Sequence, residues 1–153
     1  MNSAVLRWGG LIVIFLIAGG LVLIFRDRLT GSPSDMQIGD CFDLADPNAP
    51  SIKEVPHHPC TESHHFEVFY NAVDTSPASA TYPPLSVFGA DVTAQCKPAF
   101  EAYVGIAFDA SALDIGYLYP QSAGWGKGDR TITCYLTRSD NAPMTSSMKG
   151  AKQ

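Results

Sequence analysis

An uninterrupted apolar segment near the N-terminus constrains this chain more than any other feature. Residues 8–25 (WGGLIVIFLIAGGLVLIF) contain no charged side chain. As a helix they would rise about 1.5 Å per residue and cover about 27 Å, close to the thickness of a thin hydrocarbon core. The sequence therefore predicts a transmembrane helix at 8–25, preceded by a short cytoplasmic N-terminus at 1–7.

A cleaved signal peptide is the alternative, because Ala18, Gly19 and Gly20 imitate a cleavage site. The apolar run continues past them to Phe25, which favours an uncleaved signal anchor. The flanking Lys and Arg residues weakly favour a C-terminal side inside the cell. Long domains, however, translocate largely regardless of such charges, and four cysteines indicate an oxidising compartment. We therefore expect a single-pass protein of the cell membrane, with its C-terminal domain outside the cytoplasm.

Gly9 and Gly20 mark a candidate contact within the predicted membrane helix. They are eleven residues apart, or about three helical turns, so both lie on one face. Small residues let a second helix approach closely. The interpretation is contact with an integral membrane protein assembly of the envelope, and chance placement of glycine is the alternative.

The charge of the remaining chain limits its partners. From Leu29 onward there are fourteen acidic residues against seven Lys and Arg, a net charge of −7. Nucleic acid and anionic headgroups both require a basic surface, so neither is an expected partner. Residues 26–35 are interpreted as a polar linker, and residues 36–153 as one small extracytoplasmic domain that includes the C-terminal tail.

Hydrophobic periodicity predicts one helix and several strands in this domain. Alternation favours strands at 36–44, 52–55, 65–73, 113–119 and 130–138, with Phe66, Val68 and Tyr70 on one face of the third. A stripe with helical spacing runs through Leu85, Phe88, Val92, Cys96, Ala99 and Tyr103. Pro98 should kink this helix or start its final turns. The order predicts an α+β fold with the helix packed on an antiparallel sheet.

Four cysteines allow three disulfide pairings. Cys96 lies on the apolar stripe of the helix and Cys134 on the apolar face of the last strand, so both should point into one core. Cys41 and Cys60 share the N-terminal region, which predicts the pairs Cys41–Cys60 and Cys96–Cys134. A redox or metal tetrad is disfavoured because no C-x-x-C is present.

Six short motifs follow one another along the domain. They are IGDCF (38–42), VPHHPCTESHHFEVF (55–69), EAYVG (101–105), LDIGYLYP (113–120), WGKGDRTITC (125–134) and MTSSMKG (144–150). Their order and spacing resemble the septum formation domain of membrane-anchored actinobacterial envelope proteins, with Ser63 in place of the usual proline. The resemblance implies an envelope location and a link to septation, and it implies no established enzymatic activity.

All four histidines fall between positions 57 and 65, beside Glu62 and Glu67. Such a density of imidazoles could bind copper or zinc through His57, His58, His64 and His65. The spacing matches no closed zinc pattern, and adjacent histidines on a strand point to opposite faces. The favoured interpretation is that His64 and Glu67, which match the family motif, make structural hydrogen bonds near Cys60, while the other three histidines are solvated.

The remaining candidates do not form a catalytic set. Tyr117, Tyr119 and Trp125 are interpreted as core, although an exposed Trp125 would suit a partner contact. Asp129 and Arg130 look like a turn acid and a strand-edge base, and the serines lack a G-x-S-x-G context. The predicted function is a non-enzymatic envelope interaction module without a cofactor, acting in cell division or as an accessory subunit of a membrane assembly such as a respiratory complex. The alternative is an extracytoplasmic copper- or zinc-binding protein.

Overall fold

The computed structural model describes residues 30–47, 49 and 51–153. The predicted cytoplasmic segment 1–7, the predicted membrane helix 8–25, and Gly9 and Gly20 lie outside these described residues. Within the described part of the chain, no helix has both the length and the apolar character needed to cross a bilayer.

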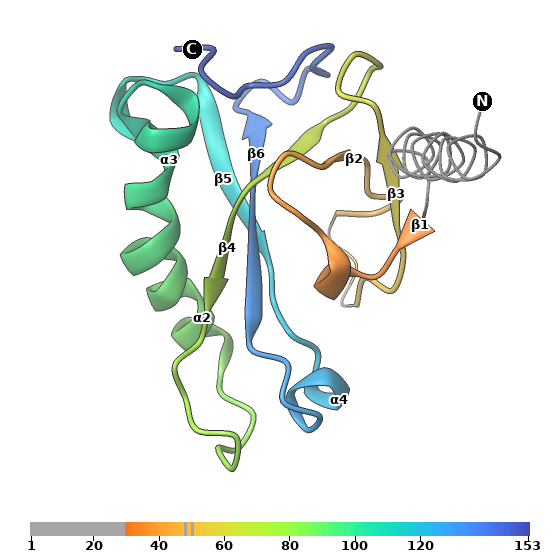
Figure 1. Cartoon of the computed structure of the whole chain (residues 1–153), viewed down its shortest axis with the longest axis vertical. Coiled ribbons are helices and arrows are strands. Elements are labelled where there is room, and N and C mark those ends of the chain that lie inside the picture. The colour runs from red at the N-terminus through yellow and green to blue at the C-terminus, as the bar shows by residue number, and fades with distance from the viewer. Residues whose placement is uncertain (1–29, 48, 50) are drawn as a thin grey trace, which may run out of the picture.

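The domain is built on a six-stranded antiparallel sheet with the order β1-β3-β2-β4-β6-β5 (Figure 1). Its longest strands are the central strands β4 (Phe66–Val73) and β6 (Thr131–Arg138), followed at one edge by β5 (Leu113–Leu118). Three shorter strands extend the sheet at its N-terminal side: β2 (Cys41–Phe42), β3 (Val55–His58) and β1 (Thr30–Gly31). The three longer strands match the alternating segments of the sequence to within one residue at each end.

A long helical segment covers one face of the central strands (Figure 1). It consists of α2 (Leu85–Asp91), the π-helical turn η2 (Val92–Cys96) and α3 (Lys97–Val104). Pro98 lies in the first turn of α3, directly after the π-helical turn, so it starts the final turns of the helical segment as the sequence predicts. The predicted α+β arrangement, a helix on an antiparallel sheet, is therefore present.

The predicted apolar stripe is wrong at its first residue. Phe88, Cys96 and Tyr103 are buried, but Leu85 is 55% exposed. Leu85 is the first residue of α2, directly after the loop that ends at Pro84, and its side chain stays outside the core. From Phe88 onward the stripe continues through the π-turn, since Cys96 and Tyr103 are both buried.

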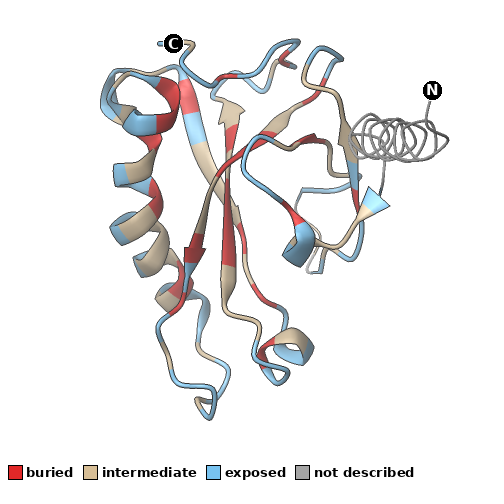
Figure 2. Ribbon diagram, viewed as in Figure 1, coloured by how far each residue is buried: buried red, intermediate tan, exposed pale blue. Residues whose placement is uncertain are grey.

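The sheet separates two apolar clusters. The larger lies under the helices and includes Phe88, Phe100, Ile132, Cys134 and Leu136. The smaller lies on the opposite face and consists of Met36, Phe42, Val55, Val68 and Leu118. Figure 2 shows the buried residues concentrated along the central strands and on the sheet-facing side of the helices.

A β-bulge changes the predicted faces of β4. Val68 is opposite Tyr135 and Tyr70 is opposite Cys134, so two steps on β4 match one step on β6. Phe66 and Val68 consequently pack with the smaller cluster, whereas Phe69 and Tyr70 pack with the larger. The prediction that Phe66, Val68 and Tyr70 share one face is wrong because the extra residue at the bulge reverses the alternation.

The N-terminal region differs most from the sequence prediction. The predicted strand 36–44 shortens to β2 because Gly39 adopts a φ of 95° and Asp40 donates its N–H to the Gln37 carbonyl, closing a turn. The predicted strand 52–55 lies further along, at Val55–His58. Part of the predicted linker 26–35 is docked on the domain, since Thr30–Gly31 pairs with β3 and Pro33–Asp35 forms the 3-10 helix η1.

The C-terminal tail closes the larger cluster. Met144 exchanges backbone hydrogen bonds with His64, and both Met144 and Met148 are buried. The tail then crosses the end of α3, where Gly150 and Lys152 donate their N–H groups to the carbonyls of Tyr103 and Val104. Shorter helical turns at Phe108–Ala110 (η3) and Ser122–Trp125 (α4) complete the domain.

Candidate functional site

The cysteines form the two predicted disulfides. Cys41 is bonded to Cys60 and Cys96 to Cys134, with Cα–Cα distances of 5.2 and 6.2 Å. The second bridge ties the π-turn η2 to the central strand β6 inside the larger cluster, and both its cysteines are buried. The first bridge joins β2 to the loop after β3, where Cys41 is buried and Cys60 is partly exposed.

Trp125 and Arg130 form a structural unit between two loops. The Arg130 guanidinium lies 3.5 Å from the centroid of the Trp125 ring and donates to the carbonyls of Trp125 and Asp129. It also donates to the carbonyls of Pro77 and Ala78, which belong to the loop after β4. Arg130 thus connects the turn before β6 to a loop more than fifty residues earlier.

Trp125 is not available as an exposed partner contact. Its side chain is 3% exposed, and its indole N–H donates to the Ala80 carbonyl at 2.8 Å. Tyr119 stacks on Phe88 with ring centroids 5.1 Å apart, and Tyr117 and Tyr119 both pack against the larger cluster. The aromatic group of the sequence is therefore core, because α2 lies directly over it.

Glu67 is a buried carboxylate with three hydrogen-bond donors. Oε1 accepts from the hydroxyls of Tyr103 at 2.7 Å and Ser147 at 2.5 Å, and Oε2 accepts from the N–H of Met148 at 2.6 Å. The pKa of Tyr103 is raised because the hydroxyl is buried and because it faces Glu67. Glu67 consequently joins β4, α3 and the C-terminal tail, the structural role predicted for it.

His64 is fully buried and has one hydrogen-bonded nitrogen. Nδ1 lies 2.8 Å from the Glu62 carbonyl, which can only accept a hydrogen bond, so Nδ1 carries the proton. Nε2 is buried and has no hydrogen-bond partner among the described residues. The predicted structural hydrogen bond is present at one nitrogen, and the other is left as a lone pair.

The other three histidines lie against aspartates. His58 Nε2 is 3.3 Å from Asp43 Oδ2, and His65 Nδ1 is 2.7 Å from Asp43 Oδ1. His57 faces Asp40 at 3.6 Å with its side chain only 10% exposed. The prediction that His57 is solvated is wrong, because β1 pairs with β3 and places Gly31 against the His57 ring.

The four histidines do not converge on one point. Among the described residues, three potential ligand atoms lie within 4.8 Å of one another at Cys41, His64 and Glu67, and this set leaves out His57, His58 and His65. Sequence reasoning missed the approach of Cys41 to His64 and Glu67. The signal was the pairing of β2 with β4, which places Cys41 directly opposite Glu67.

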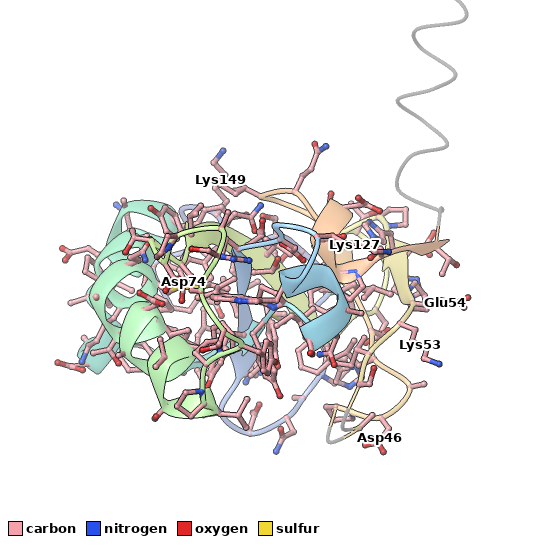
Figure 3. All side chains as sticks on the ribbon, turned by 90° about the horizontal axis from the view of Figure 1, so that it is seen from below. Asp46, Lys53, Glu54, Asp74, Lys127 and Lys149 are labelled. Atoms are coloured by element: carbon pink, nitrogen blue, oxygen red, sulfur yellow. A yellow bond between two sulfur atoms is a disulfide. The ribbon has the colours of Figure 1, made fainter. Side chains whose placement is uncertain are left out.

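A groove of about 540 Å³ opens on the face of the sheet away from the helices. Its walls come from residues 32–34, from residues 47, 49 and 51–53, and from the segment 117–135. Hydroxyl side chains line much of it, and Lys53 and Asp129 are its charged residues. Figure 3 shows Asp46, Lys53 and Glu54 on the side of the domain away from α2 and α3.

Gly116 lies opposite Tyr135, a residue that lines this groove. A Cβ atom at Gly116 would lie 2.3 Å from the ring of Tyr135 on the neighbouring strand. The glycine therefore lets the Tyr135 ring lie flat over β5, where burial raises the pKa of its hydroxyl. This contact gives a physical reason for the glycine within LDIGYLYP.

Comparison with known proteins identifies the domain through its sequence. No curated protein matches the chain, and no solved structure matches it either. The family described as septum formation matches residues 38–153, which is most of the chain and nearly all of the folded domain. The chain therefore belongs to the septum formation family.

Proposed function

We propose that this chain is a non-enzymatic, membrane-tethered binding module that acts outside the cytoplasm in cell division. Its family relates it to septum formation. The observation that supports the proposal is that the motif residues make structural contacts within the domain. Trp125 and Arg130 bond two loops together, Gly116 accommodates Tyr135, and Glu67 fixes the C-terminal tail. These residues have structural roles that shape the surface of the domain, and we assign any chemical reaction to a partner protein.

The groove opposite the helices is the proposed contact face. A groove lined by hydroxyl groups with few charges offers hydrogen bonds to a polypeptide without a large desolvation cost. The net charge of the domain favours a partner protein with a basic surface, because complementary charge speeds association. The proposed partner is an integral membrane protein assembly of the envelope, held close by the predicted anchor at 8–25.

A matched pair of substitutions tests the contact face. Ala123 is exposed on α4 and lines the groove, whereas Ala102 is exposed on α3, on the other side of the sheet. We expect Ala123→Trp to abolish copurification of the partner after gentle detergent extraction of the full chain, and Ala102→Trp to leave it unchanged. Retention of the partner by both variants would reject the groove as the contact face.

Two observations test the role in cell division: which proteins copurify with the chain, and whether cells depleted of it still form septa. Division proteins among them, with elongated cells of reduced septation when the chain is depleted, would support septum formation. Copurification with a respiratory complex, and normal septation on depletion, would instead identify an accessory subunit of that assembly. The predicted partner contact at Gly9 and Gly20 is tested separately, since Gly9→Leu with Gly20→Leu should weaken copurification while the protein stays in the membrane fraction.

A further inference from the structure

The contact between Cys41, His64 and Glu67 has the composition of a metal site. One potential ligand atom from each lies within 4.8 Å of the other two, and all three residues are buried. Cys60 lies outside this set of three, but its sulfur is bonded to that of Cys41, so reduction of the bridge would free a second sulfur next to the first. Two sulfurs, one imidazole and one carboxylate make a ligand set that Zn²⁺ accepts in tetrahedral geometry.

His64 is already in the form that binds a metal. Its Nδ1 donates to the Glu62 carbonyl, and this fixes the tautomer in which Nε2 is an unprotonated lone pair. Metal-bound histidines commonly donate their second nitrogen to a backbone carbonyl in this way. A fully buried Nε2 without a partner among the described residues is costly unless something occupies it.

Glu67 retains capacity for one more contact. A carboxylate offers about four lone-pair positions, and three are used by Tyr103, Ser147 and Met148. Oε2 accepts a single hydrogen bond, from Met148. Glu67 can therefore bind a metal without releasing the C-terminal tail.

The disulfide controls the site, because bonded sulfurs are not thiolate ligands. The two bridges differ in accessibility: Cys60 is partly exposed, whereas Cys96 and Cys134 are both 0% exposed. A small dithiol can reach Cys60 while the domain stays folded. The Cys96–Cys134 bridge becomes accessible only when the larger cluster opens.

We propose that reduction of the Cys41–Cys60 disulfide creates a Zn²⁺ site formed by Cys41, Cys60, His64 and Glu67. One thiolate of a dithiol attacks Cys60 Sγ, the Cys41–Cys60 bond breaks, and Cys41 leaves as a thiolate. The second thiol of the reductant then closes its own disulfide and releases Cys60. The protein bridge gains two electrons, and the dithiol loses two electrons and supplies two protons. Zn²⁺ binding afterwards displaces the protons of both thiols.

Zinc stoichiometry of the full chain tests this site. The chain is reduced with dithiothreitol at a concentration that spares Cys96–Cys134, desalted under anaerobic conditions and mixed with ZnCl₂. Native mass spectrometry should find one Zn²⁺ per reduced chain and none on the oxidised chain. Co²⁺ in place of Zn²⁺ should give the thiolate charge-transfer and visible bands of tetrahedral coordination. A reduced chain that binds no Zn²⁺ would overturn the proposal.

Variants assign the ligands. His64→Gln should weaken Zn²⁺ binding by more than about tenfold, whereas His58→Gln, at a histidine outside the site, should not change it. Equal losses of Zn²⁺ affinity in the two variants would instead place the metal at the histidines that lie against aspartates.

Cys41→Ser provides a measurement that needs no reductant and does not depend on the folding of His64 variants. It frees the partly exposed Cys60 with the disulfide absent, so Zn²⁺ should protect the Cys60 thiol from alkylation. Unprotected alkylation of this variant, with its folded circular dichroism spectrum retained, would also reject the site.

Discussion

The Glu67 carboxylate accepts a hydrogen bond from the Tyr103 hydroxyl at 2.7 Å, inside the core and across thirty-six positions of sequence. The bond joins the central strand β4 to the helix α3. Since the same carboxylate also holds Ser147 and Met148, one charged group connects three segments that are distant along the chain.

Glu67→Gln should lower the free energy of unfolding by about 2 to 3 kcal/mol. The amide has one acceptor oxygen, so its NH₂ group would face a donor that the carboxylate now satisfies. Urea unfolding measures the loss, and hydrogen exchange at the Met148 amide should accelerate. Glu101→Gln, at an exposed position of α3, is the control and should change stability by less than about 0.5 kcal/mol. Equal effects of the two would contradict the role given to Glu67.

The two disulfides should contribute unequally to stability. The Cys41–Cys60 bridge closes 19 residues and Cys96–Cys134 closes 38. Loop entropy alone gives about 3 and about 4 kcal/mol. Replacing each pair by serine and measuring urea unfolding should therefore show the greater loss for the second pair. The order would be reversed if the N-terminal strands contributed more to folding than the helix-on-sheet core.

Arg130→Met should destabilise the domain by about 2 kcal/mol, because carbonyls of two loops lose their donor and the Trp125 ring loses its cation. Arg138→Met is the matched control, since Arg138 pairs with the exposed Asp140 and surface ion pairs contribute little. Thermal unfolding of both variants distinguishes them. A loss below about 0.5 kcal/mol for Arg130→Met would show that the loops hold together without it.

Asp91 should make stability depend on pH in the acidic range. Its pKa is raised above 3.8 because burial disfavours the charged form and because Asp74 faces it, while Gln95 acts in the opposite direction. Asp74 is itself buried with Oδ2 lacking a hydrogen-bond partner among the described residues, and Figure 3 shows it on the helix side of the domain.

A raised folded-state pKa means that the folded chain holds this proton more tightly than the unfolded chain. Stability should therefore fall as the pH rises from about 3.8 to the raised value, and stay lower above it. Asp91→Asn removes this dependence and should stabilise the neutral protein by about 0.5 kcal/mol. Asp114→Asn, exposed on β5, should keep the wild-type pH profile, as melting curves across this range will show.

Gly116→Ala should cost about 2 kcal/mol, because the new methyl group would overlap the Tyr135 ring. In a Tyr135→Val background the same change should cost less than about 1 kcal/mol, since the smaller side chain leaves room. A double-mutant cycle by urea unfolding gives both values. Additive losses would mean that the backbone of β5, and not the ring, requires glycine.

The helix-on-sheet core was predictable because its residues follow simple periods. Ile132, Cys134 and Leu136 alternate without interruption, and Cys96 lies on the matching helical stripe, so the buried disulfide could be deduced. The bulge at Val68/Tyr70 breaks the period of β4 by an added residue. No local preference of Phe69 indicates this change, because tertiary packing decides it.

The candidate metal site was only half visible in the sequence. Cys60, His64 and Glu67 occur within eight positions, but Cys41 reaches them through the register of β2 on β4. That register depends on the turn at Gly39, and a strand prediction over 36–44 does not contain it. His57 was misplaced for a related reason, since residues expected to form a linker cover it.

The position of Met144 and Met148 determines when this domain can finish folding. Chains are synthesised from the N-terminus, and these two side chains close a core whose β4 and α3 residues are made much earlier. Until residue 148 is available, the apolar surfaces of β4 and α3 stay open and Glu67 lacks the amide that completes its bonding. The domain must therefore remain protected from aggregation during almost its whole synthesis. A nascent chain halted before residue 144 should bind chaperones as an unfolded protein does.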